Sequence, residues 1–399
     1  MRIKVEHRTP RELEDIIKKA IIGQPEGIKA IATALSAHLL RIKYSESHAG
    51  NELKKDNMLV IGPTGCGKTE SIRTVIRELD LPIPVAVIST NLLTGSGWKG
   101  KDTSSVLTDL VCACKPILSK HSKEFGLSNE LHRNDQEVYN KKLLEAIVEL
   151  CKHGIIVLDE FDKIRIHPDK NGEEDFFPKM VQHELLKMIE GGTGFGDEDR
   201  PCSKIDTTGI LFICAGAFTD LYQTNQPGNQ AKEIGFSTGF AENTKPEECN
   251  EVSFKMPSTG ELVKMGYMPE LVGRLPIRTE FKKLSEESLL KILKDSNISP
   301  VIDLKNLFYE AGYILEFTEE ALKTVAGLAY KENTGARGLR TALTEKIYPI
   351  LYSMPNGNCK VVVDADVFTN NAEANITGLD EDEAFVMYHS HHLEEFGLK

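Results

Sequence analysis

The residues that could bind a nucleotide lie together in the segment Gly62-Pro-Thr-Gly-Cys-Gly-Lys-Thr69. Their spacing fits the phosphate-binding pattern G-x-x-x-x-G-K-[ST] in full. In this pattern, backbone N–H groups and the positive end of a helix dipole converge on a phosphate. Lys68 then reaches the β- and γ-phosphates, and the hydroxyl of Thr69 binds Mg²⁺. The segment therefore predicts a site for a nucleoside triphosphate and its magnesium ion.

The flanking residues supply the elements that this pattern needs. Residues 58–61 are an apolar run too short for a helix, which predicts a buried strand. Residues 70–79 carry helix formers with apolar spacing, so the loop is expected to join a strand to a helix N-terminus. The expected nucleotide-binding residues of this segment are Gly62, Pro63, Thr64, Gly65, Cys66, Gly67, Lys68, Thr69 and Glu70.

Two carboxylates, Asp159 and Glu160, follow a second apolar run at residues 155–158. This run predicts a buried parallel strand, which we expect to lie directly beside the strand that enters the glycine loop. In a P-loop ATPase, Asp159 would sit by the Mg²⁺ ion and Glu160 would polarise the attacking water. The carboxylate pair therefore predicts hydrolysis of the nucleotide and not binding alone.

The composition is that of an ordinary globular protein, with 399 residues of which 40% are hydrophobic and 27% charged. No apolar stretch approaches the roughly 20 residues that span a bilayer, and the N-terminus lacks an apolar signal core. We therefore expect a cytoplasmic protein without a membrane partner. The eight cysteines show no C-x-x-C spacing, so no zinc is expected. A net charge of −12 argues against a nucleic-acid partner, which would call for a basic stripe.

Apolar periodicity and turn residues divide the rest of the chain. Helices are expected over residues 10–43 with a break at 22–25, over 104–151 with a polar break, and over 181–190; strands are expected over 83–88, 209–215 and 360–364. Residues 165–180 are expected to form a loop. The predicted fold class is α/β with a parallel sheet, followed by a smaller, mainly helical α+β domain. The expected domains are residues 1–280 and 281–365, with a tail at 366–399.

Four segments allow both a functional and a structural interpretation. Residues 22–25 could cover a purine base or form a helix–helix turn. Trp98, the chain's only tryptophan, lies between glycines and could be presented at a surface or tucked into its own domain. Residues 219–260 are polar except for Ile234-Gly235-Phe236, which could dock on a partner or pack on their own domain. A histidine cluster at 389–392 could bind metal or lie in a solvated tail.

Taken in order, these motifs resemble those of a known family. The glycine loop and the Leu158-Asp-Glu160 strand are followed by Pro269-Glu-Leu-Val-Gly-Arg-Leu-Pro276 and Gly335-Ala-Arg-Gly-Leu-Arg340. This order is similar to that of the AAA+ ATPases of the Clp/HSP100 group, and closest to the ClpX family, from about residue 9 to 365. The resemblance implies an AAA+ fold, ATP with Mg²⁺ as the bound nucleotide, and an adenine pocket that includes Ile21 and Ile22.

The resemblance also implies roles for residues outside the glycine loop. Arg274 matches the arginine finger offered to ATP on the next subunit, and Arg337 matches the sensor-2 arginine that contacts ATP in its own subunit. A finger supplied in trans requires a closed ring, for which the family implies a homo-hexamer. Trp98 and Lys99 occupy the place of the pore loop that grips a substrate polypeptide. Ile234-Gly235-Phe236 is similar to the tripeptide that docks on the ClpP peptidase.

The chain departs from the family at several places. The N-terminal four-cysteine zinc domain has no counterpart here, and Trp98 and Lys99 stand where the family has a tyrosine and an apolar residue. Residues 165–178 match the second pore loop poorly, and residues 192–204 carry acids in place of a basic entrance motif. The implied function is an ATP-driven unfoldase that passes unfolded or tagged proteins to a ClpP-like peptidase. The alternatives are a remodelling chaperone without a peptidase and a nucleic-acid motor of the wider AAA+ group.

Overall fold

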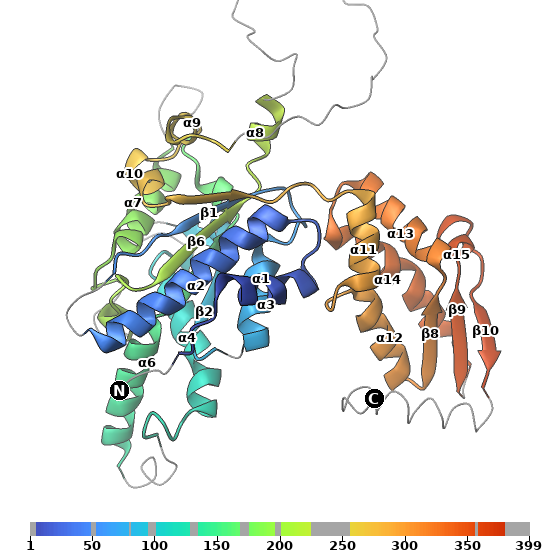
Figure 1. The fold of residues 1–399 in the computed structure, drawn as a ribbon, viewed down its shortest axis with the longest axis horizontal. Helices are drawn as coiled ribbons and strands as arrows, with labels where there is room; N and C mark the ends of the chain where they lie inside the picture. The colour runs from blue at the N-terminus through green and yellow to red at the C-terminus, as the bar shows by residue number, and fades with distance from the viewer. Residues whose placement is uncertain are drawn as a thin grey trace, which may run out of the picture. The chain divides into compact units, whose positions relative to one another are not determined.

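The fold is taken from a computed structural model (Figure 1). It describes residues 5–48, 53–79, 81–94, 101–127, 135–167, 175–195, 201–224, 256–355 and 358–379. The chain divides into two compact units. The first comprises Met1–Glu14, Glu26–Pro63 and Lys68–Phe281, and the second comprises Asp15–Pro25, Thr64–Gly67 and Lys282–Lys399.

A five-stranded parallel sheet in the order β2-β5-β6-β1-β7 forms the centre of the first unit. Its strands are β1 (Met58–Ile61), β2 (Val85–Ser89), β5 (Ile155–Asp159), β6 (Leu211–Gly216) and β7 (Ile277–Glu280). All residues of β1 and β6 are buried, as expected for a parallel sheet that helices cover on both faces. The predicted α/β class with a parallel sheet is confirmed.

The predicted neighbour of β1 was wrong. β6 lies between β1 and β5, pairing with Met58–Ile61 on one side and with Ile155–Leu158 on the other. The order of strands depends on how each crossover connection passes over the sheet, and that choice is made by tertiary packing. A local apolar run predicts a buried strand but does not indicate which strands lie beside it in the sheet.

The helices of the first unit are α2 (Pro25–Ser47), α3 (Lys68–Leu79), α4 (Ser105–Lys120), α6 (Gln136–Lys152), α7 (Phe176–Glu190), α8 (Thr219–Thr224), α9 (Thr259–Lys264) and α10 (Pro269–Gly273). Helix α1 (Pro10–Ala20) has residues in both units. Helix α2 crosses the sheet, because Gly27 packs on the Phe281 ring beyond β7 and the His38 ring bonds the His153 carbonyl before β5 (2.9 Å). The predicted helices at 10–43, 104–151 and 181–190 are confirmed, with the first broken between Ala20 and Pro25. The polar break predicted near residues 128–135 lies mostly outside the described residues.

Short elements connect the larger ones. They are the 3₁₀ turns η1 (Thr90–Leu92), η2 (Phe161–Ile164) and η3 (Pro201–Lys204) and the parallel pair β3 (Leu93–Thr94) and β4 (Lys101–Asp102). The loop expected over 165–180 is wrong at its end, because α7 begins at Phe176. The carboxylate of Asp175 accepts a hydrogen bond from the Phe177 N–H (3.2 Å) and caps this helix.

The second unit packs helices against a three-stranded sheet of order β10-β9-β8. Its helices are α11 (Glu286–Asp295), α12 (Pro300–Glu310), α13 (Glu319–Glu332), α14 (Ala336–Ser353) and α15 (Ala365–Thr369), and its strands are β8 (Tyr313–Phe317), β9 (Cys359–Val363) and β10 (Asn375–Gly378). Buried side chains such as Phe308, Leu343 and Val361 form its core. This is the smaller, mainly helical α+β domain that the sequence predicts.

The predicted tail begins too early. Asp364 is the N-cap of α15, which occupies the first residues of the predicted tail. Further on, β10 pairs antiparallel with β9, so that Asn375 lies opposite Val362. All four residues of β10 are exposed. A strand without a buried face shows no alternation of apolar and polar residues, which is why the sequence pattern missed it.

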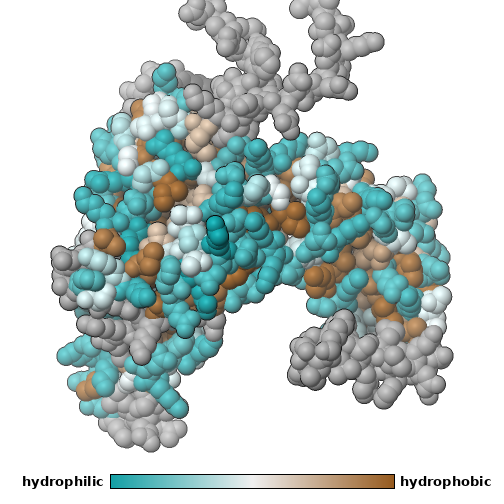
Figure 2. Space-filling view, viewed as in Figure 1, coloured by the Kyte–Doolittle hydropathy of each residue, from teal (hydrophilic) through white to brown (hydrophobic). Residues whose placement is uncertain are grey.

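Surface composition agrees with a globular protein. Hydrophobic residues are scattered among hydrophilic ones on the face shown in Figure 2. No helix within the described part of the chain is both long and apolar enough to cross a membrane.

Candidate active site

The glycine loop lies between the end of β1 and the first turn of α3, where the sequence predicts it. Its glycines are needed for two reasons. Gly65 and Gly67 have positive φ angles of 74° and 100°, and a Cβ on Gly62 would lie 2.3 Å from the Phe281 carbonyl oxygen. The Lys68 ammonium donates hydrogen bonds to the carbonyls of Gly62 (2.7 Å) and Pro63 (2.8 Å), which holds it beside the loop.

Thr69 and Asp159 meet at the carboxyl edge of the sheet. The Thr69 hydroxyl donates a hydrogen bond of 2.8 Å to one Asp159 carboxylate oxygen, and the other oxygen accepts the Glu160 N–H at 2.8 Å. Mg²⁺ prefers hard oxygen ligands and is usually held by one or two protein oxygens together with water and phosphate. The structure brings together the two residues predicted from the sequence to lie by the metal, and their oxygens fit Mg²⁺.

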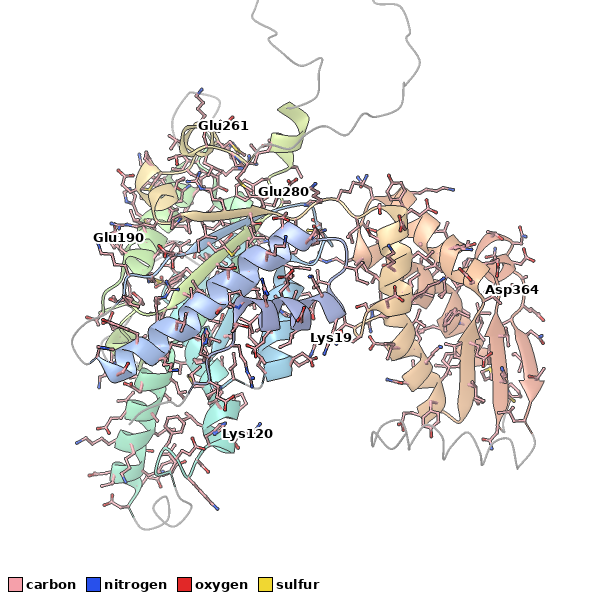
Figure 3. All side chains as sticks on the ribbon, viewed as in Figure 1. Lys19, Lys120, Glu190, Glu261, Glu280 and Asp364 are labelled. Atoms are coloured by element: carbon pink, nitrogen blue, oxygen red, sulfur yellow. The ribbon has the colours of Figure 1, made fainter. Side chains whose placement is uncertain are left out.

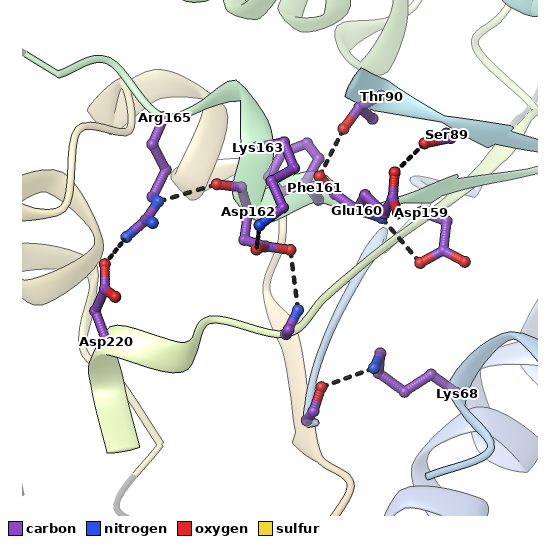
Figure 4. Close-up of polar contacts among 12 residues, drawn as sticks. Lys68, Ser89, Thr90, Asp159, Glu160, Phe161, Asp162, Lys163, Arg165 and Asp220 are labelled. Atoms are coloured by element: carbon purple, nitrogen blue, oxygen red, sulfur yellow. Dashed lines mark hydrogen bonds and ion pairs between the residues drawn. The ribbon is translucent and has the colours of Figure 1, made fainter. Parts of the chain in front are cut away.

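Glu160 has an unusual backbone. Its φ and ψ angles of 56° and 32° place it in the left-handed region, which non-glycine residues seldom adopt. The Thr90 hydroxyl donates to the Glu160 carbonyl (2.8 Å), and the Ser89 hydroxyl donates to the Glu160 carboxylate (Figure 4). Such strain costs about 1–3 kcal/mol and concentrates at functional sites. The turn aims the Glu160 side chain toward the end of β2.

Ser89 and Thr90 were not predicted as site residues. Both lie at the carboxyl end of β2, which is the neighbour of β5. In parallel α/β sheets, ligands bind outside the carboxyl ends of the strands. Two hydroxyl residues at the end of the predicted strand 83–88 were therefore the available signal.

A second set of contacts anchors the turn after Glu160. The Asp162 carboxylate is buried and accepts the Ala217 N–H (2.9 Å), which ties η2 to the end of β6. The Arg165 guanidinium donates to the Asp162 carbonyl (2.9 Å) and to Asp220 (2.5 Å), as Figure 4 shows. This hydrogen bond from Arg165 lowers the pKa of Asp220. These contacts anchor the turn that follows Asp159 and Glu160, and so help to fix the direction of both carboxylates at the end of β5.

Arg274, the predicted arginine finger, lies at the end of α10 in the first unit. It follows the last residue of α10, and its guanidinium contacts the carboxylate of Glu190 through Nη2 (2.8 Å) and Nε (3.2 Å). Glu190 is the last residue of α7 (Figure 3). The Arg274 side chain is 55% exposed. Within the described residues, the guanidinium of this predicted arginine finger therefore pairs with Glu190.

The residues predicted for the adenine pocket belong to the second unit. Ile21 is buried, and one of its methyl groups lies 3.1 Å from the point that a Cβ on Gly67 would occupy. Ile22 packs on the core of the second unit.

Arg337, in the first turn of α14, is exposed and lines a surface depression together with Arg340. Trp98, Lys99 and the tripeptide Ile234-Gly235-Phe236 lie outside the described residues, as does the histidine cluster at 389–392.

The glycine loop, the carboxylate pair after β5 and the parallel sheet define a P-loop ATPase. Residues 53–278 match the model of the AAA domain (Cdc48 subfamily), and residues 284–359 match that of the C-terminal, D2-small domain of ClpB protein. The chain is 32% identical over 381 residues to the ATP-dependent Clp protease ATP-binding subunit ClpX of Borrelia duttonii (strain Ly), a match that covers 92% of this chain and 80% of that protein. The protein of the same name from Treponema denticola is 30% identical over 385 residues, with 94% and 84% covered.

The chain belongs to the ClpX family of AAA+ ATPases. The resemblance seen in its motifs is confirmed, and the protein is an ATP hydrolase of the AAA+ type. Its relatives match along both structural units, so the family assignment does not rest on the phosphate loop alone.

Proposed function

We propose that the protein is the ATPase subunit of a ClpXP-like protease. In this proposal it forms a homo-hexameric ring in the cytoplasm, unfolds tagged or unfolded proteins and feeds them to a ClpP-like peptidase. The arrangement of Thr69, Asp159 and Glu160 carries the ATP-driven part, since it supplies metal ligands and a carboxylate for water activation at one edge of the sheet. The relatives named as Clp protease subunits support the peptidase part.

Each residue of the site has a proposed task. Lys68 neutralises the β- and γ-phosphates, while Thr69 and Asp159 hold the Mg²⁺ ion, whose charge offsets that of the phosphates. The Glu160 carboxylate orients the attacking water and takes up its proton. Ile21 and Ile22 cover the adenine. Arg337 contacts the phosphates from the same subunit.

The proposed ring completes the site. Arg274 would supply positive charge to ATP bound by the neighbouring subunit, which makes hydrolysis depend on assembly. Its exposed guanidinium is compatible with contact to another subunit. Heterologous contacts of this type close into a ring when the rotation between copies permits.

The segments outside the described residues have proposed roles in handling substrate. Trp98 and Lys99 would contact the polypeptide in the ring's pore, where an indole ring offers a large apolar surface. Ile234-Gly235-Phe236 would enter apolar clefts on the peptidase. The large ATPase domain would end near residue 280, and the smaller domain would follow it.

ATP-dependent degradation of a tagged, folded reporter protein tests this function. We expect loss of the reporter only when the ATPase, the cognate peptidase and hydrolysable ATP are all present. Unfolding of the reporter without any binding to the peptidase would instead identify a remodelling chaperone. If DNA or RNA, and no protein, stimulated ATP hydrolysis, the proposal would be replaced by a nucleic-acid motor.

A further inference from the structure

The tip of the phosphate loop is bonded to the first residue of a distant helix. The Ala336 N–H donates a 2.9 Å hydrogen bond to the Gly65 carbonyl. Ala336 begins α14, and Gly65 lies in the segment Thr64–Gly67, which groups with the second unit. The contact therefore joins two parts of the same unit that are about 270 residues apart in the chain.

Two glycines make this contact possible. A Cβ on Gly65 would lie 2.4 Å from the Thr334 carbonyl oxygen, and a Cβ on Gly335 would lie 2.8 Å from the Gly65 carbonyl oxygen. Both distances are shorter than any real Cβ contact. Gly65 and Gly335 also have positive φ angles of 74° and 65°. The two backbones approach so closely only because neither residue carries a side chain.

The other side of the loop tip is also supported within the second unit. Gly67 packs on Ile21, and the segment that carries Ile21 is held by several hydrogen bonds. The Gln24 side chain bonds both backbone groups of Lys282 (2.7 and 2.8 Å), and the Ser296 hydroxyl donates to the Ala20 carbonyl (2.7 Å). The loop tip is thus held on one side by Ile21 and on the other side by the turn that precedes α14.

The hydrogen bond controls the direction of a peptide plane. In a trans peptide, the C=O of one residue and the N–H of the next point in opposite directions. Because the Gly65 carbonyl is directed at Ala336, the Cys66 N–H is directed away from it. Inward-pointing N–H groups of this loop are what binds phosphate in the G-x-x-x-x-G-K-[ST] pattern.

We propose that Ala336 is a positioning residue for the phosphate loop. Its N–H fixes the Gly65–Cys66 peptide in the orientation that receives phosphate. This inference rests on the proposed binding of ATP by the loop. Arg337 is the next residue, and one backbone contact therefore sets both the loop and the arginine proposed to reach the same phosphates.

Ala336→Pro tests the proposal. Proline suits the first position of a helix but lacks an N–H, and its ring Cδ takes the place of the hydrogen that points at the Gly65 carbonyl oxygen. The substitution therefore removes the hydrogen bond and also displaces this carbonyl, while the start of α14 is preserved. The loss of one hydrogen bond corresponds to a roughly two- to tenfold weaker affinity for ATP and ADP, measured by fluorescence titration with labelled nucleotides. Nucleotide affinity is the readout, because hydrolysis would also report on Arg337, which follows Ala336 and is proposed to reach the same phosphates.

Two further variants make the result specific. Glu286→Pro makes the same substitution at the first position of α11, where Ser285 is the cap, and should leave nucleotide affinity unchanged. Ala336→Gly keeps the N–H and should retain the parent's affinity. Parental affinity in Ala336→Pro, or an equal loss in Glu286→Pro, would overturn the proposal. A parent protein that binds no nucleotide would instead refute the proposed function.

Discussion

The Thr69 hydroxyl and the Asp159 carboxylate are hydrogen-bonded at 2.8 Å although β6 separates the strands that precede them. Asp159 is the last residue of β5, and Thr69 lies in the first turn of α3, which follows β1 through the glycine loop. The chain leaves β1 beside the end of β6, where the Gly62 N–H donates to the Gly216 carbonyl (3.1 Å). The strand order sets this meeting point, so its geometry depends on the whole sheet.

Thr69→Val should raise the Mg²⁺ concentration needed for ATP hydrolysis. Valine keeps the shape of the side chain but removes the oxygen proposed as a metal ligand. Titration of ATPase activity with Mg²⁺ measures the effect. Thr74→Val is the matched control on the same helix, because the Thr74 hydroxyl is buried and has no hydrogen-bond partner among the described residues. An unchanged Mg²⁺ requirement in Thr69→Val would rule out this role for its hydroxyl.

Glu160→Gln should bind ATP and assemble like the parent but hydrolyse ATP about 10²–10⁴-fold more slowly. An amide cannot take the proton from the attacking water, and general-base catalysis contributes a factor of this size. The measurements are single-turnover hydrolysis and nucleotide binding. A hydrolysis rate equal to the parent's would show that another group activates the water.

Arg274→Ala should reduce hydrolysis by about 10³-fold or more, the usual contribution of an arginine finger, while each subunit still binds ATP. When Arg274→Ala and Glu160→Gln subunits are mixed, some sites receive an intact Glu160 from one subunit and an intact Arg274 from its neighbour. Partial recovery of ATPase activity in the mixture is therefore expected. Mixtures that stay as inactive as each variant alone would contradict a role in trans.

Glu190→Gln serves as the companion to this experiment. Its carboxylate is the partner of Arg274 within the protomer, and both side chains are substantially exposed. An exposed ion pair contributes little to stability, about 0–1 kcal/mol. We therefore expect the thermal midpoint of Glu190→Gln to remain close to the parent's. A large fall in that midpoint would show that the pair is a structural contact.

Phe236→Ala and Ile234→Glu should abolish degradation by the peptidase and leave ATP hydrolysis unchanged. The first variant removes an aromatic anchor, and the second places a charge in an apolar cleft. Reporter degradation and ATPase activity are measured side by side. Undiminished degradation in both variants would refute the docking role of the tripeptide.

The stability of the protein should fall on mild acidification, and His38 should cause part of the loss. Burial, which disfavours the charged imidazolium, lowers the pKa of His38 from 6.5 to about 3. Between these values the unfolded chain binds the proton and the folded protein does not, so stability decreases as the pH falls through 6.5 toward 3. The contribution amounts to about 2 kcal/mol between about pH 7 and pH 5.

His38→Gln should remove that contribution. Glutamine does not titrate and can still donate to the His153 carbonyl, which His38 bonds at 2.9 Å. Urea denaturation at both pH values gives the free energies of unfolding. The decrease between the two pH values should be about 2 kcal/mol smaller in the variant. Equal decreases in the parent and the variant would show that His38 is not neutral in the folded protein.

The sequence predicts the parts of the site that short motifs encode. Each of these motifs is recognised from residues that are adjacent in the sequence. They are the apolar run of β1 with the glycine loop that ends in Lys68-Thr69, and the pair Asp159 and Glu160. Ser285 and Thr318 cap α11 and α13 with their hydroxyl groups, and a capping residue of this type is likewise a signal within the local sequence.

Features that depend on tertiary structure could not be predicted from the sequence. The place of β6 between β1 and β5 follows from the crossovers, and the exposed strand β10 shows no apolar face. The left-handed backbone of Glu160 is held by Thr90, which is 70 residues away in the chain. No local pattern predicts a hydrogen bond over that separation, although two hydroxyl residues at the end of a predicted strand do mark Ser89 and Thr90 as candidates.

The membership of Asp15–Pro25 in the second unit bears on how the protein can be dissected. A fragment that starts at Lys282 would lack the partners of Ser296 and of the Lys282 backbone, and would uncover a serine that is only 1% exposed in the intact chain. The C-terminal part is therefore better produced with the N-terminal residues supplied, either as a fusion or as a peptide added in trans. Protease cleavage near residue 281 would leave the two pieces associated until denaturant separates them.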